Sequence, residues 1–148
     1  MLYIGADHGG YQLKEQLKKW LVKQKVEYID VGAPALADGD DYPVYAEKVA
    51  QGVSVAPEKQ LGLLMCRSGQ GVAITANKMK GVRAAVVWNE EEAVASKNDD
   101  HANILCLPSD YVSFVKAKKI VKAWLDTSFS KEERHVRRVK MITKLEKH

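Results

Sequence analysis

Short apolar runs alternate with longer amphipathic segments along the whole chain, and this alternation limits the fold more than any other feature. The runs have the length and composition of buried strands. They are "LYIG", "VEYIDVG", "LGLLMC", "VRAAVVW" and "NILCLP". Because parallel strands need crossover connections, which are normally right-handed, strands that alternate with helices predict an α/β fold. We expect a doubly wound, Rossmann-like or flavodoxin-like parallel sheet of five strands, sandwiched by helices.

The longer segments carry apolar residues at helical spacing. In the first segment, Lys14 is expected away from the apolar face, which holds Leu13, Leu17, Trp20 and Leu21. In the second, the predicted apolar face holds Val44, Val49, Ala50 and Val53. Further helices are predicted at about 71–78, 90–98, 109–126 and 132–146.

Size and composition indicate one globular domain over residues 1–148, of which 46% are hydrophobic. No apolar run approaches the length of a membrane span, and the start lacks the pattern of a signal peptide, so we expect a cytoplasmic protein away from membranes. Cys66 and Cys106 lie in apolar runs, which suits reduced thiols. The net charge of +4 favours an anionic partner such as a phosphorylated metabolite; nucleic-acid binding is not expected without a helix-turn-helix or a continuous basic surface.

Ligands of such folds bind beyond the carboxyl ends of the strands, near the point where the strand order reverses. The first apolar run ends at Asp7 and His8, and the third ends at Cys66. In the commonest five-strand order, the first and third strands flank the reversal point. We therefore expect Asp7, His8 and Cys66 to converge there.

The stretch "CRSGQGVAITANK" follows the third strand with a polar loop and the start of a helix. Its small residues Ser68, Gly69 and Gly71 let the backbone approach a ligand closely, and free N–H groups at a helix start attract anions. The loop lacks the P-loop lysine and the full dinucleotide fingerprint. A thiol beside such N–H groups is held toward its thiolate form, which serves as a base or nucleophile. From these residues alone, a buried strand cysteine beside an ordinary tight turn is an equally good interpretation.

Several motifs together resemble one family, the type B ribose-5-phosphate isomerases and the related galactose-6-phosphate isomerase subunits. They are "GADHGGYQLK", "DYPVYAEKVA", "CRSGQGVAITANK", "GVRAA", "HANIL" and "RHVRRVKMI". The resemblance implies a flavodoxin-like sheet, and homodimers or homotetramers with sites shared across the interface. It also implies interconversion of aldose and ketose sugar phosphates without a metal ion or another cofactor. The helix at about 132–146 is then expected to pack on the site or on a partner subunit.

The resemblance also implies roles for individual residues. Cys66 would be the base, and Ser68 takes the place of the usual threonine beside it. Asp7 and His8 would bind sugar hydroxyls and the phosphate end of the substrate. The backbone N–H groups of the loop would form an anion hole, which comprises Arg67, Ser68, Gly69, Gln70 and Gly71.

A basic cluster near the carboxyl end would hold the phosphate. Arg134 and Arg138 lie four residues apart on a predicted helix, so they share a face, with His135 beside them. Without the family motif, a solvated basic helix face would be the simpler interpretation of these residues.

The chain departs from the family pattern at three places. Asp99 and Asp100 align with the family's His-Asn pair, and a histidine, His101, follows two places later. Ring opening could then fall to His101 or to Asp99, with Asp100 contacting the sugar, or His101 could merely cap the strand. Asp110 aligns with a family arginine and Arg67 with a family glycine, so Arg67 is expected to compensate for Asp110. On this account the substrate would be a hexose 6-phosphate or another sugar phosphate rather than ribose 5-phosphate, and the sequence leaves both a pentose 5-phosphate and a hexose 6-phosphate open.

Two other functions stay open at this level. The chain could be one subunit of a hetero-oligomeric galactose-6-phosphate-type isomerase that needs a paralogous subunit, or a sugar-phosphate or nucleotide sensor without catalysis. No metal site is expected, because the histidines are scattered and form no spaced cluster with cysteine or carboxylate. They are His8, His101, His135 and His148.

Overall fold

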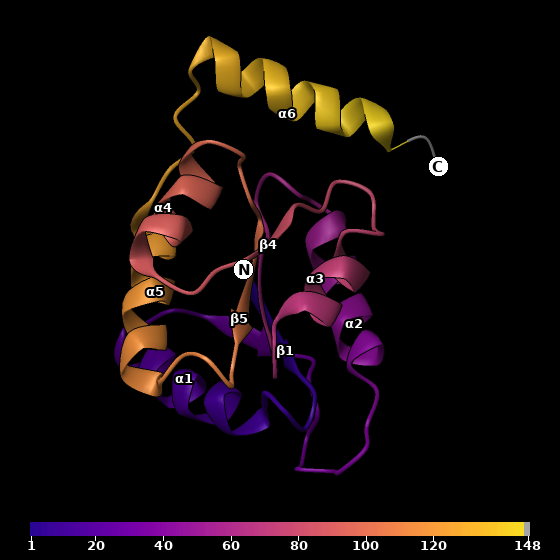
Figure 1. The fold of residues 1–148 in the computed structure, drawn as a ribbon, viewed down its shortest axis with the longest axis vertical. Coiled ribbons are helices and arrows are strands. Elements are labelled where there is room, and N and C mark those ends of the chain that lie inside the picture. The colour runs from indigo at the N-terminus through magenta and orange to yellow at the C-terminus, as the bar shows by residue number, and fades with distance from the viewer. Residues whose placement is uncertain (147–148) are drawn as a thin grey trace.

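The computed structural model describes residues 1–146 as strands and helices in alternation. The strands are β1 (Leu2–Ala6), β2 (Tyr28–Asp30), β3 (Leu61–Cys66), β4 (Ala84–Val86) and β5 (Ile104–Pro108). The helices are α1 (Tyr11–Lys23), α2 (Tyr42–Ser54), α3 (Gln70–Ala76), α4 (Glu90–Asn98), α5 (Phe114–Asp126) and α6 (Glu133–Leu145). All strand pairs are parallel; α1, α4 and α5 cover one face of the sheet and α2 and α3 the other (Figure 1). The predicted doubly wound α/β sandwich is confirmed.

The strand order is β2-β1-β3-β5-β4. The expected neighbours β1 and β3 lie side by side, but the last two strands are exchanged relative to the commonest order. Burial gives a reason for the exchange. All residues of β5 are buried, as suits an inner strand of a parallel sheet, whereas the short β4 is half-buried and lies at the edge.

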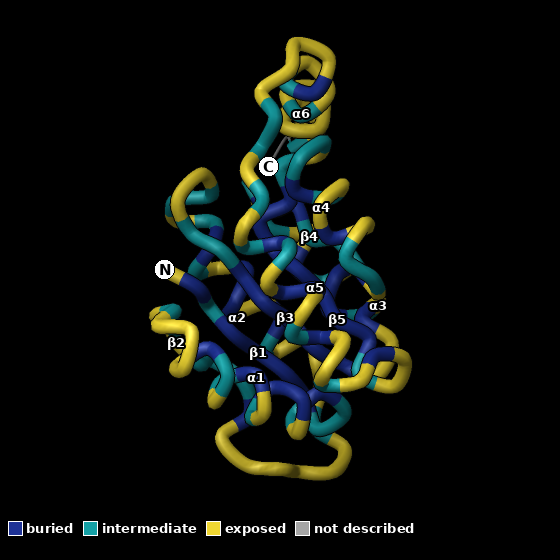
Figure 2. Tube along the Cα trace, turned by 90° about the vertical axis from the view of Figure 1, so that its left-hand side faces the viewer, coloured by how far each residue is buried: buried dark blue, intermediate teal, exposed yellow. Residues whose placement is uncertain are grey.

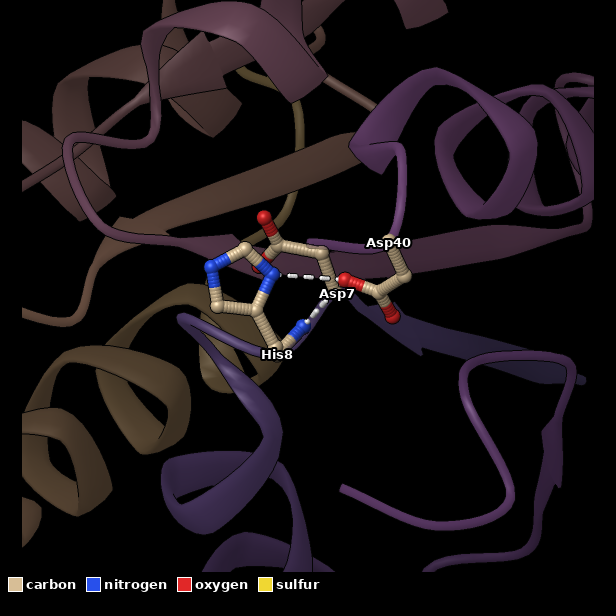
Figure 3. Close-up of side chains that lie close together, drawn as sticks. All are labelled: Asp7, His8 and Asp40. Carbon is tan, nitrogen blue, oxygen red and sulfur yellow. Dashed lines mark hydrogen bonds and ion pairs between the residues drawn. The ribbon is translucent and has the colours of Figure 1, made fainter. Parts of the chain in front are cut away.

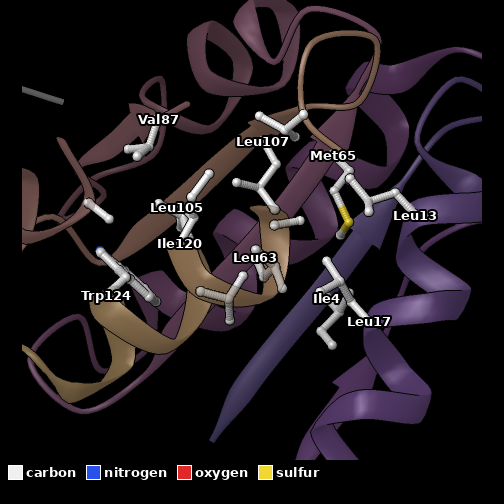
Figure 4. Packing of buried hydrophobic residues seen from close by; sticks show 14 of the residues in the cluster. Ile4, Leu13, Leu17, Leu63, Met65, Val87, Leu105, Leu107, Ile120 and Trp124 are labelled. Carbon is white, nitrogen blue, oxygen red and sulfur yellow. The ribbon is translucent and has the colours of Figure 1, made fainter. Parts of the chain in front are cut away.

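The larger core lies between the sheet and the α1/α5 layer (Figure 4). Leu17 of α1 and Ile120 and Trp124 of α5 pack against Leu63 and Leu105 of the sheet, and all are almost completely buried. Burying each such side chain contributes roughly 1.5–3 kcal/mol. A second core joins α2 and α3 to the other face of the sheet, so both layers are fixed to the strands.

Two details of the predicted helix faces were wrong. Lys14 is fully buried, because its amino group bonds to the Asp30 carboxylate at 2.6 Å and to the Ala33 carbonyl oxygen at 3.2 Å. Charge pairing therefore overrides the hydropathy pattern at this position. In α2, Val44 is exposed and Ala46 is buried in its place. At 3.6 residues per turn, Val44 lies about 120–180° around the helix from the buried residues Val49, Ala50 and Val53, whereas Ala46 shares their face.

The helix predicted from residue 109 begins at Phe114 instead. Ser113 is its N-cap and accepts a hydrogen bond from the Lys116 N–H group. Before it, the N–H groups of Ser109 and Asp110 bond to the carbonyl oxygens of Cys66 and Arg67. Residues 109–112 thus form a turn that fastens β5 to the end of β3.

Helix α6 stands apart from the other helices, at the edge of the sheet where the strands begin (Figure 1). His135 is its one buried residue, and the rest of the helix is half-buried or exposed (Figure 2). Apolar Met141, Ile142 and Leu145 are all at least 40% exposed. Within residues 1–146, none of the helices combines the length and the apolar character needed to span a membrane.

Candidate active site

The ends of β1 and β3 bring two of the sequence motifs together. Ala6 pairs with Met65, so Asp7 and Cys66 follow directly on neighbouring strands. A Cβ atom on Gly10 would lie 2.5 Å from the Met65 carbonyl oxygen, so only glycine lets the β1–α1 loop lie this close to β3. The structure therefore places the Asp7–His8 segment beside Cys66, as expected.

Cys66 faces a tight turn at the end of β3. The Gly69 N–H group donates a hydrogen bond to the Cys66 Sγ atom at 3.2 Å, and the thiol is 5% exposed. Gly69 has a φ of +74°, in the left-handed region that glycine adopts without strain. An N–H group aimed at sulfur is an arrangement that stabilises negative charge there.

The rest of the loop leads into the short helix α3. Ser68 Oγ accepts a hydrogen bond from the Gln70 N–H group at 3.3 Å. A Cβ atom on Gly71 would lie 2.5 Å from the Tyr42 ring, so the aromatic ring packs directly against the loop backbone. The predicted anion-hole residues thus form one continuous turn around the cysteine.

His8 is held by the carboxylate of Asp40, from the loop between β2 and α2 (Figure 3). Asp40 Oδ1 accepts a hydrogen bond from the His8 backbone N–H at 2.9 Å and lies 2.7 Å from His8 Nδ1. This side-chain hydrogen bond raises the pKa of His8, and burial raises the pKa of the neighbouring Asp7. The Nδ1 atom is engaged with Asp40, so His8 has Nε2 left to meet a ligand.

Asp7, His8 and Asp40 are also the residues that could hold a metal ion, since their ligand atoms lie within 4.8 Å of one another. The prediction that no histidine joins carboxylates in a cluster was therefore wrong for His8. However, a metal ion between His8 and Asp40 would have to replace the direct hydrogen bond between His8 Nδ1 and Asp40 Oδ1, which is 2.7 Å long. The other described histidines each meet a single carboxylate, His101 with Glu58 and His135 with Asp99. His148 lies outside the described residues.

Arg67 and Asp110 form an ion pair at 3.7 Å next to the turn. The two opposite charges thus lie side by side, and the compensation by Arg67 at a bound ligand stays a prediction. Both side chains are about half exposed or more, so the pair contributes little stability, and its main effect is on the local charge.

The remaining predicted site residues lie at the opposite edge of the sheet. They are Asp99, Asp100, His101, Arg134, His135 and Arg138. His135 bonds to Ser130 Oγ at 2.6 Å, and its Nδ1 lies 3.9 Å from Asp99. Arg134 Nε donates to Glu132 at 2.8 Å, and both arginines are exposed on α6.

His101 faces away from the arginines. Its ring stacks on Phe129 with centroids 4.5 Å apart, and its Nδ1 atom lies 3.5 Å from Glu58. Burial lowers the pKa of His101, and the nearby cations Arg83, Lys97 and Lys131 lower it further.

The residues around Cys66 and those around Asp99 and α6 cannot meet within one chain. Gly62 pairs with Ile104 and Cys66 with Pro108, so the length of β5 separates Cys66 from the residues that precede that strand. Four residues of parallel strand span about 13 Å. One chain therefore brings Asp7, His8 and the Cys66 loop together, and it holds Asp99 to His101 and the α6 arginines far from them.

Sequence reasoning missed Asp40 and Tyr42 as parts of this site. Both lie in the segment "GAPALADGDDYP", residues 32–43, in which no site residue was predicted. Its acidic tip beside a predicted site was the available signal, but no periodicity fixes where a loop of this length folds.

Comparison with known proteins agrees with this geometry. Residues 2–142 match the family model described as "Ribose/Galactose Isomerase". The probable ribose-5-phosphate isomerase B of Mycoplasma genitalium is 38% identical over 146 residues, covering 99% of this chain and 95% of that protein. The ribose-5-phosphate isomerase B of Escherichia coli is 38% identical, covering 97% of this chain and 94% of that protein.

Solved structures match equally well. The crystal structure of the Mycoplasma genitalium enzyme with bound ribulose-5-phosphate superposes with a TM-score of 0.95 at 38% identity, covering 99% of this chain and 96% of that chain. The Clostridium thermocellum ribose-5-phosphate isomerase B gives a TM-score of 0.93 at 39% identity, covering 99% and 97%. The chain therefore belongs to the ribose/galactose isomerase family and is an isomerase.

Proposed function

We propose that the protein interconverts an aldose phosphate and its ketose phosphate through an enediolate, with Cys66 as the base and without a metal ion. The observation that carries this proposal is the position of the Cys66 sulfur. It lies at a strand end beside Asp7 and His8, with the Gly69 N–H group directed at it. A proton-abstracting group beside fixed N–H donors is what enediolate chemistry requires.

The reaction moves two protons and no net electrons. The Cys66 thiolate takes the proton from C2 of the open-chain aldose, and the electron pair of that bond flows to the C1 carbonyl oxygen. The His8 side chain and the backbone N–H groups of the 67–71 loop, other than those of Gly69 and Gln70 that bond to Cys66 Sγ and Ser68 Oγ, stabilise the enediolate oxygens. Transfer of the O2 hydroxyl proton to O1, and return of the sulfur-bound proton to C1, gives the ketose.

The proposed substrate is ribose 5-phosphate and its ketose, ribulose 5-phosphate. Support comes from the names of the relatives and from the ribulose-5-phosphate in the Mycoplasma genitalium structure. A hexose 6-phosphate is the second candidate, because acidic residues replace family residues at Asp99, Asp100 and Asp110.

We infer that each site is completed by a second copy of the chain in a homodimer or homotetramer. Ring opening requires a group in contact with the anomeric oxygen on C1, only two bonds from the C2 atom that Cys66 deprotonates. In one chain, Asp99, His101 and the α6 arginines lie too far from Cys66 for this contact. A neighbouring copy that presents its α6 edge would supply them, with Arg134 and Arg138 on the phosphate.

Between the two candidates for ring opening, the geometry favours Asp99. It lies beside α6, 3.9 Å from His135, and its carboxylate is about half exposed. It could take the proton of the anomeric hydroxyl group. His101 instead stacks on Phe129 and faces Glu58, on the side of α6 away from the arginines.

The test is the pair of variants Cys66→Ala and Cys106→Ala. Cys106 is completely buried in β5, so Cys106→Ala controls for the loss of a buried sulfur atom. We expect Cys66→Ala to abolish isomerisation of ribose 5-phosphate while sugar-phosphate binding and folding persist, and Cys106→Ala to keep turnover at the cost of some stability. Wild-type activity should survive EDTA. Near-normal turnover of Cys66→Ala would refute the cysteine base.

Two results would replace the proposed isomerase function with another one. Binding of sugar phosphates without turnover of any pentose 5-phosphate or hexose 6-phosphate would indicate a non-catalytic sensor. Turnover that starts only after a paralogous subunit is added would indicate a hetero-oligomeric isomerase.

A further inference from the structure

A cavity of about 370 Å³ opens at the edge of the sheet where β3 begins, away from Cys66. Its walls come from the turn before β3, the last turn of α4 and the segment that joins α5 to α6. Leu61, Leu125 and Phe129 form an apolar side, and His101 lies stacked on Phe129. The cavity is therefore a shaped pocket with one aromatic wall.

Positive charge dominates this cavity. Lys59, Lys97 and Lys131 line it, and Glu58 is the one acid among its described lining residues. Glu58 is shared, because its carboxylate lies 3.5 Å from His101 and 3.7 Å from Arg83. An excess of cations over a single exposed carboxylate leaves the pocket without charge balance.

Lys97 is the one buried cation among these three lysines. It is 8% exposed, and its Nζ atom lies 4.0 Å from the ring centroid of Trp124, the residue at one end of the core cluster in Figure 4. Among residues 1–146, no group accepts a hydrogen bond from Nζ and no carboxylate pairs with it. Burial, together with repulsion from Arg83, lowers the pKa of Lys97 to about 8. Contact with an aromatic face offsets only part of the hydration that a buried ammonium loses.

Arg83 adds a second buried cation nearby, and its Nη2 atom lies 3.7 Å from Glu58 Oε1. Its Nε atom donates to the His101 carbonyl oxygen at 2.9 Å, but its buried Nη2 atom makes no hydrogen bond within residues 1–146. A neighbouring cavity of about 480 Å³ shares the wall of His101, Phe129 and Lys131 and adds Lys140 and Lys144 of α6. The positive field thus extends beyond the first cavity.

This region is separate from the proposed isomerase site. Lys140 follows Arg134 by six residues and Arg138 by two, which places it about 120° and 160° around α6 from them. Cys66 and its loop lie at the other edge of the sheet. Within one chain, a ligand here would contact neither the thiol nor the two arginines.

We propose that the cavity lined by Lys59, Lys97, His101 and Lys131, the lysine pocket, binds a small organic anion through phosphate or carboxylate oxygens. The Lys97 ammonium donates to the anion, Lys131 neutralises it at the mouth, and the apolar wall receives the carbon part of the ligand. This site goes beyond the proposed isomerase function and does not depend on it.

The test measures the reactivity of single lysines. The full-length protein is pulse-labelled at pH 8 with acetic anhydride, and the acetylation of each lysine is quantified by peptide mass spectrometry. Inorganic phosphate and citrate are the probes, and chloride at equal ionic strength is the screening control. An anion that raises the pKa of Lys97 by one unit slows its labelling about fivefold at this pH. Lys122, exposed on α5 and paired with Asp126, is the control lysine and should not respond.

Two variants give the test its specificity. Lys131→Ala, at an exposed position, should weaken the protection of Lys97 without changing its labelling in chloride. Arg138→Ala should leave the protection intact. Protection by phosphate alone or citrate alone identifies the anion class. Equal labelling of Lys97 in all three salts, or loss of protection in Arg138→Ala, would overturn the proposal.

Discussion

At the scale of single residues, the least expected feature of the site is the bond between His8 and Asp40. One carboxylate oxygen meets both the backbone N–H and the Nδ1 atom of His8, so ring orientation and protonation are set together. The hydrogen bond raises the pKa of His8 above its ordinary value of 6.5. The side chain therefore keeps its positive charge to a higher pH, which suits contact with a phosphorylated or enediolate ligand.

Asp40→Asn should lower the pKa of His8 and weaken sugar-phosphate binding at neutral pH, because the amide cannot stabilise the imidazolium as the carboxylate does. Titration of the His8 ring signals by NMR measures the first effect without reference to activity. Asp41→Asn, at an exposed neighbouring position, is the matched control. An equal His8 pKa in both variants would contradict the role assigned to Asp40.

Lys97 predicts a dependence of stability on pH. Its pKa is about 8 in the folded protein and 10.5 is its ordinary value, so between these pH values the unfolded chain binds the additional proton. The cost of burying the charge is fully present below pH 8 and disappears as the pH rises toward 10.5.

Lys97→Met should accordingly raise the free energy of unfolding at pH 7, by roughly 1–3 kcal/mol. This advantage over the wild type should be smaller at pH 10. Urea unfolding at several pH values, analysed as the difference between variant and wild type, measures the effect. Burial raises the pKa of Cys106, which gives the stability an opposite dependence on pH. This contribution is the same in both proteins, so it cancels in the difference. A constant difference across this pH range would contradict the assignment.

At the scale of helices and strands, the hydropathy pattern predicts most of what forms. Strand runs such as "LGLLMC" are apolar throughout because both faces are covered, and the convergence of Asp7 with Cys66 follows from the adjacency of β1 and β3. The pattern fails where pairing or capping overrides it. Lys14 is buried by its bond to Asp30, and α5 starts late because Ser113 caps it. The position of β4 at the edge depends on long-range packing, which no local pattern encodes.

Helix α6 gives a prediction for a whole element. Arg134→Ala and Arg138→Ala should each weaken sugar phosphates by roughly 1.5–3 kcal/mol, the usual contribution of a charged hydrogen bond. The matching unphosphorylated sugars should lose far less. Lys140→Ala removes an exposed cation from another side of α6; it is the control and should bind as wild type. Isothermal titration with both ligand classes measures the effects, and equal losses for both classes would indicate damage to the helix instead.

At the scale of the whole molecule, the predicted site is split between two edges of one sheet. Sequence motifs identify residues but do not give the distances between them in the fold. The sequence alone was therefore compatible with Cys66 and Asp99 of one chain contacting the same ligand. The register of β3 and β5 removes that possibility within a chain. The exposed apolar residues of α6, with Leu145 at 77%, leave this edge suited to contact with a second copy.

Mixing of inactive variants tests this arrangement. Cys66→Ala and Asp99→Asn should each be inactive alone, because every site in either homodimer lacks one required group. After unfolding, mixing in equal amounts and refolding, half of the dimers are mixed, and each carries one site with both defects and one intact site. Activity should return to about a quarter of wild type, as random pairing in a two-fold dimer requires.

The controls separate a shared site from residual activity of the variants themselves. Refolding either variant alone must give no activity, and a mixture of Cys66→Ala with Gly69→Ala, whose defects lie in the same turn, must also stay inactive. Cys66→Ala should regain activity when mixed with Asp99→Asn, which would assign ring opening to Asp99. Mixed with His101→Ala, it should give no activity beyond that of His101→Ala itself. If Cys66→Ala and Asp99→Asn never complement each other, each chain must complete its own site, and the edge that carries α6 would have to move against the sheet to do so.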